Sequence, residues 1–165
     1  VPVLKTTDQT VIDQSLDVML WALQQYDPDH WLALYHDQAR LLIKQNDGEF
    51  KHYLDRYKYH VGYPEHPPEY YRDRAGEFLQ KLEQQLVAND GKALFGEQWS
   101  FADIAILPFV SQFANVDLDW FAQSRFQRVY RWYLEFEQSA LFQSCMKKYS
   151  QWQPEQEPVY FPEAA

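Results

Sequence analysis

The sequence predicts a mainly α-helical protein in which a short β-β-α segment precedes an all-helical body. Apolar residues recur at helical spacing through most of the chain, whereas short β-prone runs occur only in the first twelve residues. A polar cluster that contains a proline, Tyr26-Asp27-Pro28-Asp29, separates the two patterns and is typical of a linker. We therefore expect two units, residues 1–26 and residues 27–165.

In the first unit, we expect short strands at Val1–Leu4 and Thr10–Ile12, joined by a turn at Thr7–Gln9. A helix should begin around Asp13–Ser15, because apolar residues then follow at i, i+3, i+4 and i+7: Leu16, Met19, Leu20 and Leu23. Two strands and one helix bury their own faces poorly. The first unit is therefore expected to be the end of a larger domain.

In the second unit, apolar stripes predict helices over 34–45, 50–61, 75–86 and 126–133, with a loop at 62–68 and an extended tail from Gln151 onward. Asn46-Asp47-Gly48 should break or restart the first of these helices. Asn89-Asp90-Gly91 should close the helix over 75–86.

A further helix should begin at Ser100, which stands three residues before Asp103. This spacing predicts a capping box, and Trp99 and Ile104 occupy the positions of a hydrophobic staple. The helix is apolar nearly all round, so it should be central and buried, and Pro108 should bend it near Ile104. Ser100 and Asp103 are interpreted as structural, because no histidine lies near them in the sequence to complete a catalytic set.

The composition of the chain argues against several classes of function. The net charge of −9 disfavours binding to nucleic acid, and no apolar run is long enough to span a membrane. The single cysteine, Cys145, excludes an internal disulfide and suits a reducing cytoplasm. Cys145 is interpreted as a packed or idle thiol. The five histidines show no i, i+4 pairing, so no metal site is expected.

The segment from Tyr53 to Tyr71 is dense in tyrosine, with Arg56 and Lys58 interleaved. Such a segment can form a stacking surface for single-stranded nucleic acid. The acidic balance favours the other interpretation, in which it is part core and part interface and contributes to a substrate pocket.

Two stretches together resemble one known family. LFGEQWSFADIAILPFVSQF, at 94–113, resembles the central-helix segment of the C-terminal domain of glutathione S-transferases, including its Ser/Thr-x-x-Asp capping box. VPVL followed by TVIDQSLDVMLWAL resembles the last part of the thioredoxin-like domain of the same family. The two matches occur in the family's order on either side of the predicted linker.

The resemblance implies a site for glutathione on the first unit. Val1 and Pro2 match the residue and the cis-proline with which the family pairs the cysteinyl part of glutathione through backbone contacts. Gln14 and Ser15 match its Gln/Glu-Ser pair, which contacts the γ-glutamyl carboxylate. A helix start offers free amides to such an anion. The alternative interpretation is that Asp13 or Ser15 is only an N-cap.

The resemblance assigns no catalytic residue, because the family's activating Tyr, Ser or Cys lies before Val1. It implies a fragment of a bacterial-type glutathione transferase, inactive alone. The parent would be a homodimer that conjugates glutathione to small electrophiles or reduces disulfides, and it would need no metal. A non-catalytic scaffold module of the same fold is the alternative, and a free-standing helical domain with its own partner is a third.

Overall fold

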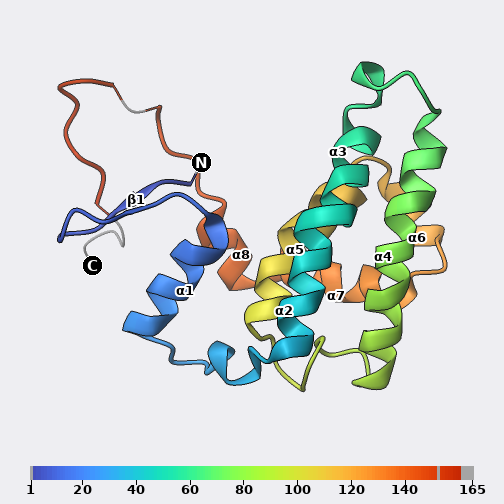
Figure 1. Cartoon of the computed structure of the whole chain (residues 1–165), viewed down its shortest axis with the longest axis horizontal. Helices are drawn as coiled ribbons and strands as arrows, with labels where there is room; N and C mark the ends of the chain where they lie inside the picture. The colour runs from blue at the N-terminus through green and yellow to red at the C-terminus, as the bar shows by residue number, and fades with distance from the viewer. Residues whose placement is uncertain (1, 152, 161–165) are drawn as a thin grey trace.

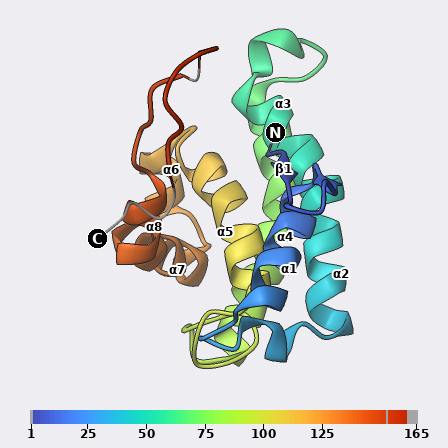
Figure 2. The same cartoon turned by 90° about the vertical axis from the view of Figure 1, so that its left-hand side faces the viewer.

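The computed structural model describes residues 2–151 and 153–160 of the chain. It is mainly helical, as predicted, with a two-stranded hairpin and helix α1 on one side and the helices α2 to α7 packed together on the other (Figure 1). Viewed from the hairpin side, α1 lies across the helical body, with α2 on one side of it and α7 and α8 on the other (Figure 2).

The predicted β-β-α segment is present. Strand β1 (Leu4–Lys5) pairs antiparallel with β2 (Val11–Ile12), and α1 spans Ser15–Gln25. The turn between the strands holds Gln9 at a φ of 70°. No residue of α1 is fully buried, but its apolar stripe packs against the core through four half-buried side chains: Leu16, Met19, Leu20 and Leu23.

The next helix begins later than the sequence predicts, although it ends at the predicted residue. The chain forms a 3₁₀ turn, η1 (Trp31–Leu34), and α2 begins only at Asp37 and ends at Gln45. The start is later than the predicted residue 34, because the ring Nδ1 of His36 accepts a hydrogen bond from the Ala39 N–H at 3.3 Å and so caps α2. The apolar pattern cannot reveal a histidine cap.

The predicted break at Asn46-Asp47-Gly48 is wrong. Residues Asn46–Phe50 form one π-helical turn, η2, which joins α2 directly to α3 (Lys51–Lys58). Asn46 and Phe50 are buried, and the Phe50 ring packs 4.8 Å from that of Phe78. Burial of these side chains therefore outweighs the turn preference of the local sequence, and the helix widens without ending.

Helix α4 (Pro68–Ala88) is longer than predicted and follows the 3₁₀ turn η3 (His60–Gly62). Its predicted end is confirmed: the Gly91 N–H donates to the Leu86 carbonyl at 2.7 Å, with a φ of 77° at Gly91. This backbone favours glycine, and a Cβ at Gly91 would also lie 2.9 Å from an Arg128 side-chain nitrogen.

The predicted central helix is α5 (Phe101–Ala114), and nine of its fourteen residues are buried. It contacts α2, α3 and α7. Pro108 lies inside it on an exposed position, and the predicted bend and staple contact stay predictions.

Three helices complete the body: α6 (Leu118–Gln123), α7 (Gln127–Gln138) and α8 (Ala140–Cys145). Helices α6 and α8 were not predicted from the apolar pattern.

The predicted capping box joins Ser100 to Asp103, and both side chains are buried. The Asp103 carboxylate accepts the Ser100 N–H at 2.9 Å and the Ser100 hydroxyl at 2.7 Å through Oδ2. Its Oδ1 accepts the Leu94 N–H at 2.9 Å and the indole N–H of Trp132 at 3.1 Å. One carboxylate therefore joins the start of α5, the loop before it and the middle of α7.

Helix α7 is capped by a residue from another helix. Its N-cap residue, Phe126, carries no capping side chain, and Glu83 of α4 takes that role. The Glu83 carboxylate accepts the Arg128 N–H at 3.0 and 3.1 Å and the Val129 N–H at 3.0 Å. These amides occupy the second and third positions of α7, where an anion also interacts favourably with the helix dipole.

Asp103→Ala should lower the free energy of unfolding by at least about 3 kcal/mol, because it leaves buried N–H groups of Leu94, Ser100 and Trp132 without an acceptor. Asp103→Asn keeps one acceptor oxygen and should lose about half as much. Urea denaturation measures both, with exposed Glu135→Ala as the control, expected within about 0.5 kcal/mol of the parent. A similar value for Asp103→Ala and Glu135→Ala would contradict the assigned role.

Glu83→Ala should destabilise the protein by about 1–2 kcal/mol, because α7 loses the acceptor for two of its first amides. Glu83→Gln, which retains an acceptor oxygen, should lose less. The matched control is Gln84→Ala on the exposed side of α4. Thermal or urea unfolding of the three variants tests this, and equal stabilities for Glu83→Ala and Gln84→Ala would overturn the capping assignment.

Candidate functional site

The predicted glutathione contacts fall at the start of α1. Val1 lies outside the described residues, and Pro2 is exposed. Gln14 is the N-cap residue of α1 in an extended conformation, and Ser15 is its first helical residue. Both side chains are exposed. The predicted position of this pair at a helix start is therefore confirmed, while its role in binding stays a prediction.

The first turn of α1 has free hydrogen-bond donors. The first helical hydrogen bond runs from the Val18 N–H to the Gln14 carbonyl at 3.0 Å, and no side chain caps the helix. Within the described part of the chain, the amides of Ser15, Leu16 and Asp17 have no acceptor. Free amides and the positive end of the helix dipole together favour an anion at this point.

Two carboxylates flank these amides. Asp17 lies in the first turn of α1, and Asp13 precedes the helix, where the side-chain Nε2 of Gln14 donates to its Oδ1 at 3.5 Å. Their charge opposes a simple anion but attracts a cation close by. The arrangement therefore suits a ligand group that carries both charges rather than an isolated anion.

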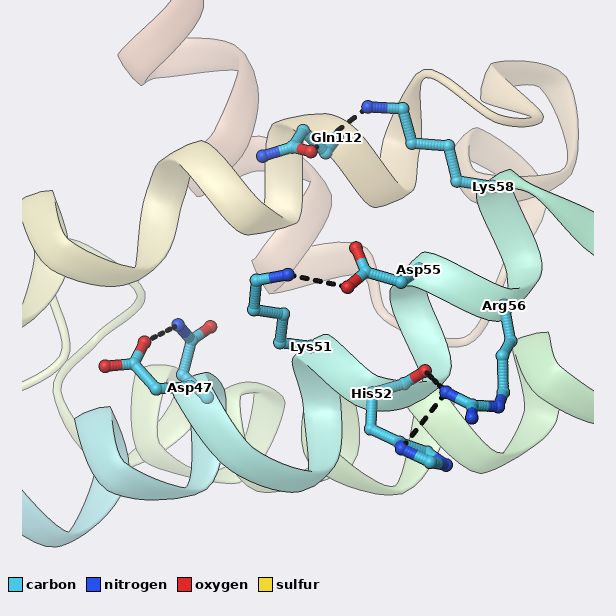
Figure 3. Close-up of polar contacts among 8 residues, drawn as sticks. Asp47, Lys51, His52, Asp55, Arg56, Lys58 and Gln112 are labelled. Atoms are coloured by element: carbon cyan, nitrogen blue, oxygen red, sulfur yellow. Dashed lines mark hydrogen bonds and ion pairs between the residues drawn. The ribbon is translucent and has the colours of Figure 1, made fainter. Parts of the chain in front are cut away.

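A second group of polar residues lines a groove between α3 and α5. The groove has a volume of about 420 Å³, and its lining comes from the ends of both helices and the turns that follow them: Lys58, His60, Ser111, Gln112, Asn115 and Val116. The Lys58 Nζ donates to the Gln112 Oε1 at 3.2 Å across it (Figure 3).

Lys51 and Asp55 extend this polar face along α3. Lys51 Nζ and Asp55 Oδ2 lie 2.6 Å apart, and both side chains point toward α5, as does Lys58, whereas His52 and Arg56 point away from it (Figure 3). The spacing of Lys51, Asp55 and Lys58 at i, i+4 and i+7 is visible in the sequence, and it is the signal by which this face is recognisable before the structure is known.

The tyrosine-dense segment is partly core, as predicted. Tyr57 and Tyr71 are buried, and burial raises the pKa of both hydroxyls. Tyr59 and Tyr70 are exposed. The Arg56 guanidinium carbon lies 4.7 Å from the centre of the Tyr63 ring. This arginine is therefore in contact with a ring of its own segment.

Ser100 and Asp103 do not line the groove between α3 and α5, which agrees with a structural role. Burial raises the pKa of Asp103, and its four hydrogen bonds oppose that shift.

Cys145 is exposed at the end of α8, with Ser144 Oγ 4.0 Å from its sulfur. Among the described residues, no group of three or more His, Cys, Asp or Glu side chains is arranged to hold a metal ion. No helix in the described ranges combines the length and apolar character that a membrane span needs.

Residues 31–135, well over half of the chain, match the family model for the C-terminal domain of glutathione S-transferases. The chain belongs to the glutathione S-transferase family. The matched range contains the capping box of α5 and the groove between α3 and α5. A search of curated protein sequences finds no match.

Solved structures of other glutathione S-transferases share the fold. A Gtt2-class enzyme of Vibrio parahaemolyticus superposes with a TM-score of 0.65 at 19% identity, over 87% of this chain and 72% of that protein. A glutathione S-transferase of Actinobacillus pleuropneumoniae superposes with a TM-score of 0.64 at 18% identity, over 87% of this chain. This chain spans 66% of the second protein's length. At these identities the likeness shows the fold alone.

Proposed function

We propose that the protein binds glutathione at the start of α1 and serves in the transfer of glutathione to a small electrophile or in glutathione-dependent reduction of a disulfide. The observation that carries the proposal is the set of free first-turn amides at Ser15, Leu16 and Asp17, beside the exposed Gln14 and Ser15 side chains.

The chemistry of glutathione fits this helix start. Its γ-glutamyl end carries a carboxylate next to an ammonium group. The carboxylate would accept hydrogen bonds from the first-turn amides and the Ser15 hydroxyl, and the Gln14 amide supplies a further donor. The ammonium would lie near Asp13 or Asp17, so that the two acidic residues support the zwitterion.

The helical body would supply the second-substrate side. Its groove between α3 and α5 combines polar groups of Lys58, Gln112 and Asn115 with a largely apolar lining, which suits an electrophile or disulfide that has both polar and apolar parts. In conjugation, the glutathione sulfur would form a bond to the electrophilic carbon while the leaving group departs and the thiol proton passes to solvent. We assign no thiol-activating residue within the described chain. A homodimer in the cytoplasm, without a metal, is part of the proposal.

Ser15→Ala should weaken glutathione binding about five- to tenfold, because it removes one hydrogen bond to a charged group while leaving the amides in place. Isothermal titration calorimetry on the full-length protein measures this. Ser144→Ala, which removes an exposed serine hydroxyl on α8, is the matched control and should bind as the parent does.

The outcomes separate the assignments. If the parent binds glutathione and Ser15→Ala binds it with the same affinity, Ser15 is not part of the site, but glutathione is still the ligand. No binding by the folded parent would contradict the proposed function and favour the non-catalytic scaffold. Where glutathione binds, loss of an aryl halide in its presence, followed by absorbance, tests transfer directly.

A further inference from the structure

The groove between α3 and α5 contains a cation that no acidic side chain neutralises. Lys58 is exposed at the end of α3, and its Nζ donates to the Gln112 Oε1 at 3.2 Å and lies 5.1 Å from the centre of the Tyr59 ring (Figure 3). Among residues 2–151 and 153–160, its ammonium group forms no ion pair. Because the protein has a net charge of −9, an unpaired lysine on a groove reverses the overall charge locally and attracts an anion.

The carboxylates on the elements around this groove are engaged with other groups. On α3, the Asp55 carboxylate lies 2.6 Å from the Lys51 Nζ. On α7, the Glu137 carboxylate accepts the Ser111 hydroxyl at 3.0 Å. Asp117, which directly follows the groove in the chain, caps the start of α6 with its side chain. These contacts leave the charge of the groove lysine available to a ligand.

The groove also has free hydrogen-bond donors. The Lys58 ammonium has three N–H groups, and its bond to Gln112 uses one of them. In the part of the chain that the structure describes, the Gln112 Nε2 has no acceptor, whereas the Ser111 hydroxyl is already used by Glu137. The Asn115 Nδ2 is used as well, because it donates to the Ser111 carbonyl at 2.8 Å. A ligand therefore meets one charged donor and one neutral amide donor, a combination that suits a carboxylate.

The apolar part of the groove is aliphatic. Val116 and the methylene groups of the Lys58 and Gln112 side chains are its main apolar groups, and no Phe, Tyr or Trp is among the described residues that line it. The volume of about 420 Å³ is within the range of small-molecule sites and exceeds what a carboxylate alone would fill. Such walls fit a flexible aliphatic chain, whereas a planar aromatic ring would find no side chain of these three types to pack against.

We propose that the groove takes electrophiles that are aliphatic carboxylates, and that Lys58 is the residue that selects them. The carboxylate accepts hydrogen bonds from the Lys58 ammonium, and the aliphatic chain lies against Val116. This inference rests on the proposed function, because it takes the groove as the second-substrate side. With a halogenated substrate, the glutathione sulfur forms a bond to the electrophilic carbon and the carbon–halogen bond breaks. The halide leaves with the electron pair of that bond, and the thiol proton passes to solvent.

Binding of an unreactive analogue tests the groove separately from the transfer. The analogue is 6-acetamidohexanoate, and 6-acetamidohexanamide has the same chain without the charge. In NMR titrations of the full-length protein, the carboxylate should bind about fivefold more tightly than the amide, because a partly solvated ion pair is worth only slightly more than a neutral hydrogen bond. Lys58→Gln should abolish this difference. Lys44→Gln, which removes an exposed lysine from α2, is the matched control and should bind both compounds as the parent does.

Two reactive compounds test the selection during transfer. They are 6-(iodoacetamido)hexanoate and its uncharged amide, which react equally well with free thiols because the carboxylate is far from the reacting carbon. Release of iodide to glutathione should have a kcat/KM about fivefold higher for the carboxylate, through a lower KM, and Lys58→Gln should reduce it to the value for the amide. All proteins in this comparison carry Cys145→Ser, because iodoacetamides also alkylate an exposed cysteine.

The two measurements separate this proposal from the proposed function. Equal affinity of the parent for 6-acetamidohexanoate and its amide, or an unchanged preference in Lys58→Gln, would overturn selection by Lys58 whether or not transfer occurs. Transfer with equal kcat/KM to both iodoacetamides would also overturn it, while the proposed function would stand. Tighter binding of the carboxylate that depends on Lys58, without enzyme-dependent transfer to either compound, would support the groove assignment and contradict the proposed function.

Discussion

A single buried carboxylate holds together the parts of this molecule that are far apart in the sequence. Asp103 accepts hydrogen bonds from the Leu94 and Ser100 backbones, the Ser100 hydroxyl and the Trp132 indole. Burying a carboxylate is unfavourable, and for the same reason burial raises the pKa of Asp103. The cost is offset because each donor would otherwise be a buried N–H or O–H without an acceptor, so donors and carboxylate require one another.

The surfaces proposed to bind ligands depend on this arrangement without taking part in it. With the start of α5 fixed, its far end presents Gln112 and Asn115 to the groove against Lys58 of α3. The Glu83 cap acts similarly at the other edge, where it ties α7 to α4. Rigid internal contacts thus position exposed polar side chains, as binding sites require.

The sequence was informative where the interaction is local. The capping box, the buried α5 and the start of α1 at Ser15 follow from residues within one helical turn. The partners that Asp103 finds in Leu94 and Trp132, and the cap that Glu83 gives to α7, join positions 9 to 46 residues apart, which no periodic pattern encodes. The π-turn at Asn46–Phe50 was not predicted for a related reason, since burial in the tertiary structure outweighed the turn preference of the local sequence. The groove beside Lys58 likewise assembles from separate helices.

Native-state hydrogen exchange at the amides of Leu94 and Ser100 would test the role of Asp103 most directly. If this carboxylate organises the core, both amides should exchange only through global unfolding, with the same free energy of opening as the most protected amides of α5. The Trp132 indole proton should share that protection. Exchange of the Leu94 or Ser100 amide through a local opening, several kcal/mol below global unfolding, would show that the carboxylate contacts are dispensable and would contradict the account.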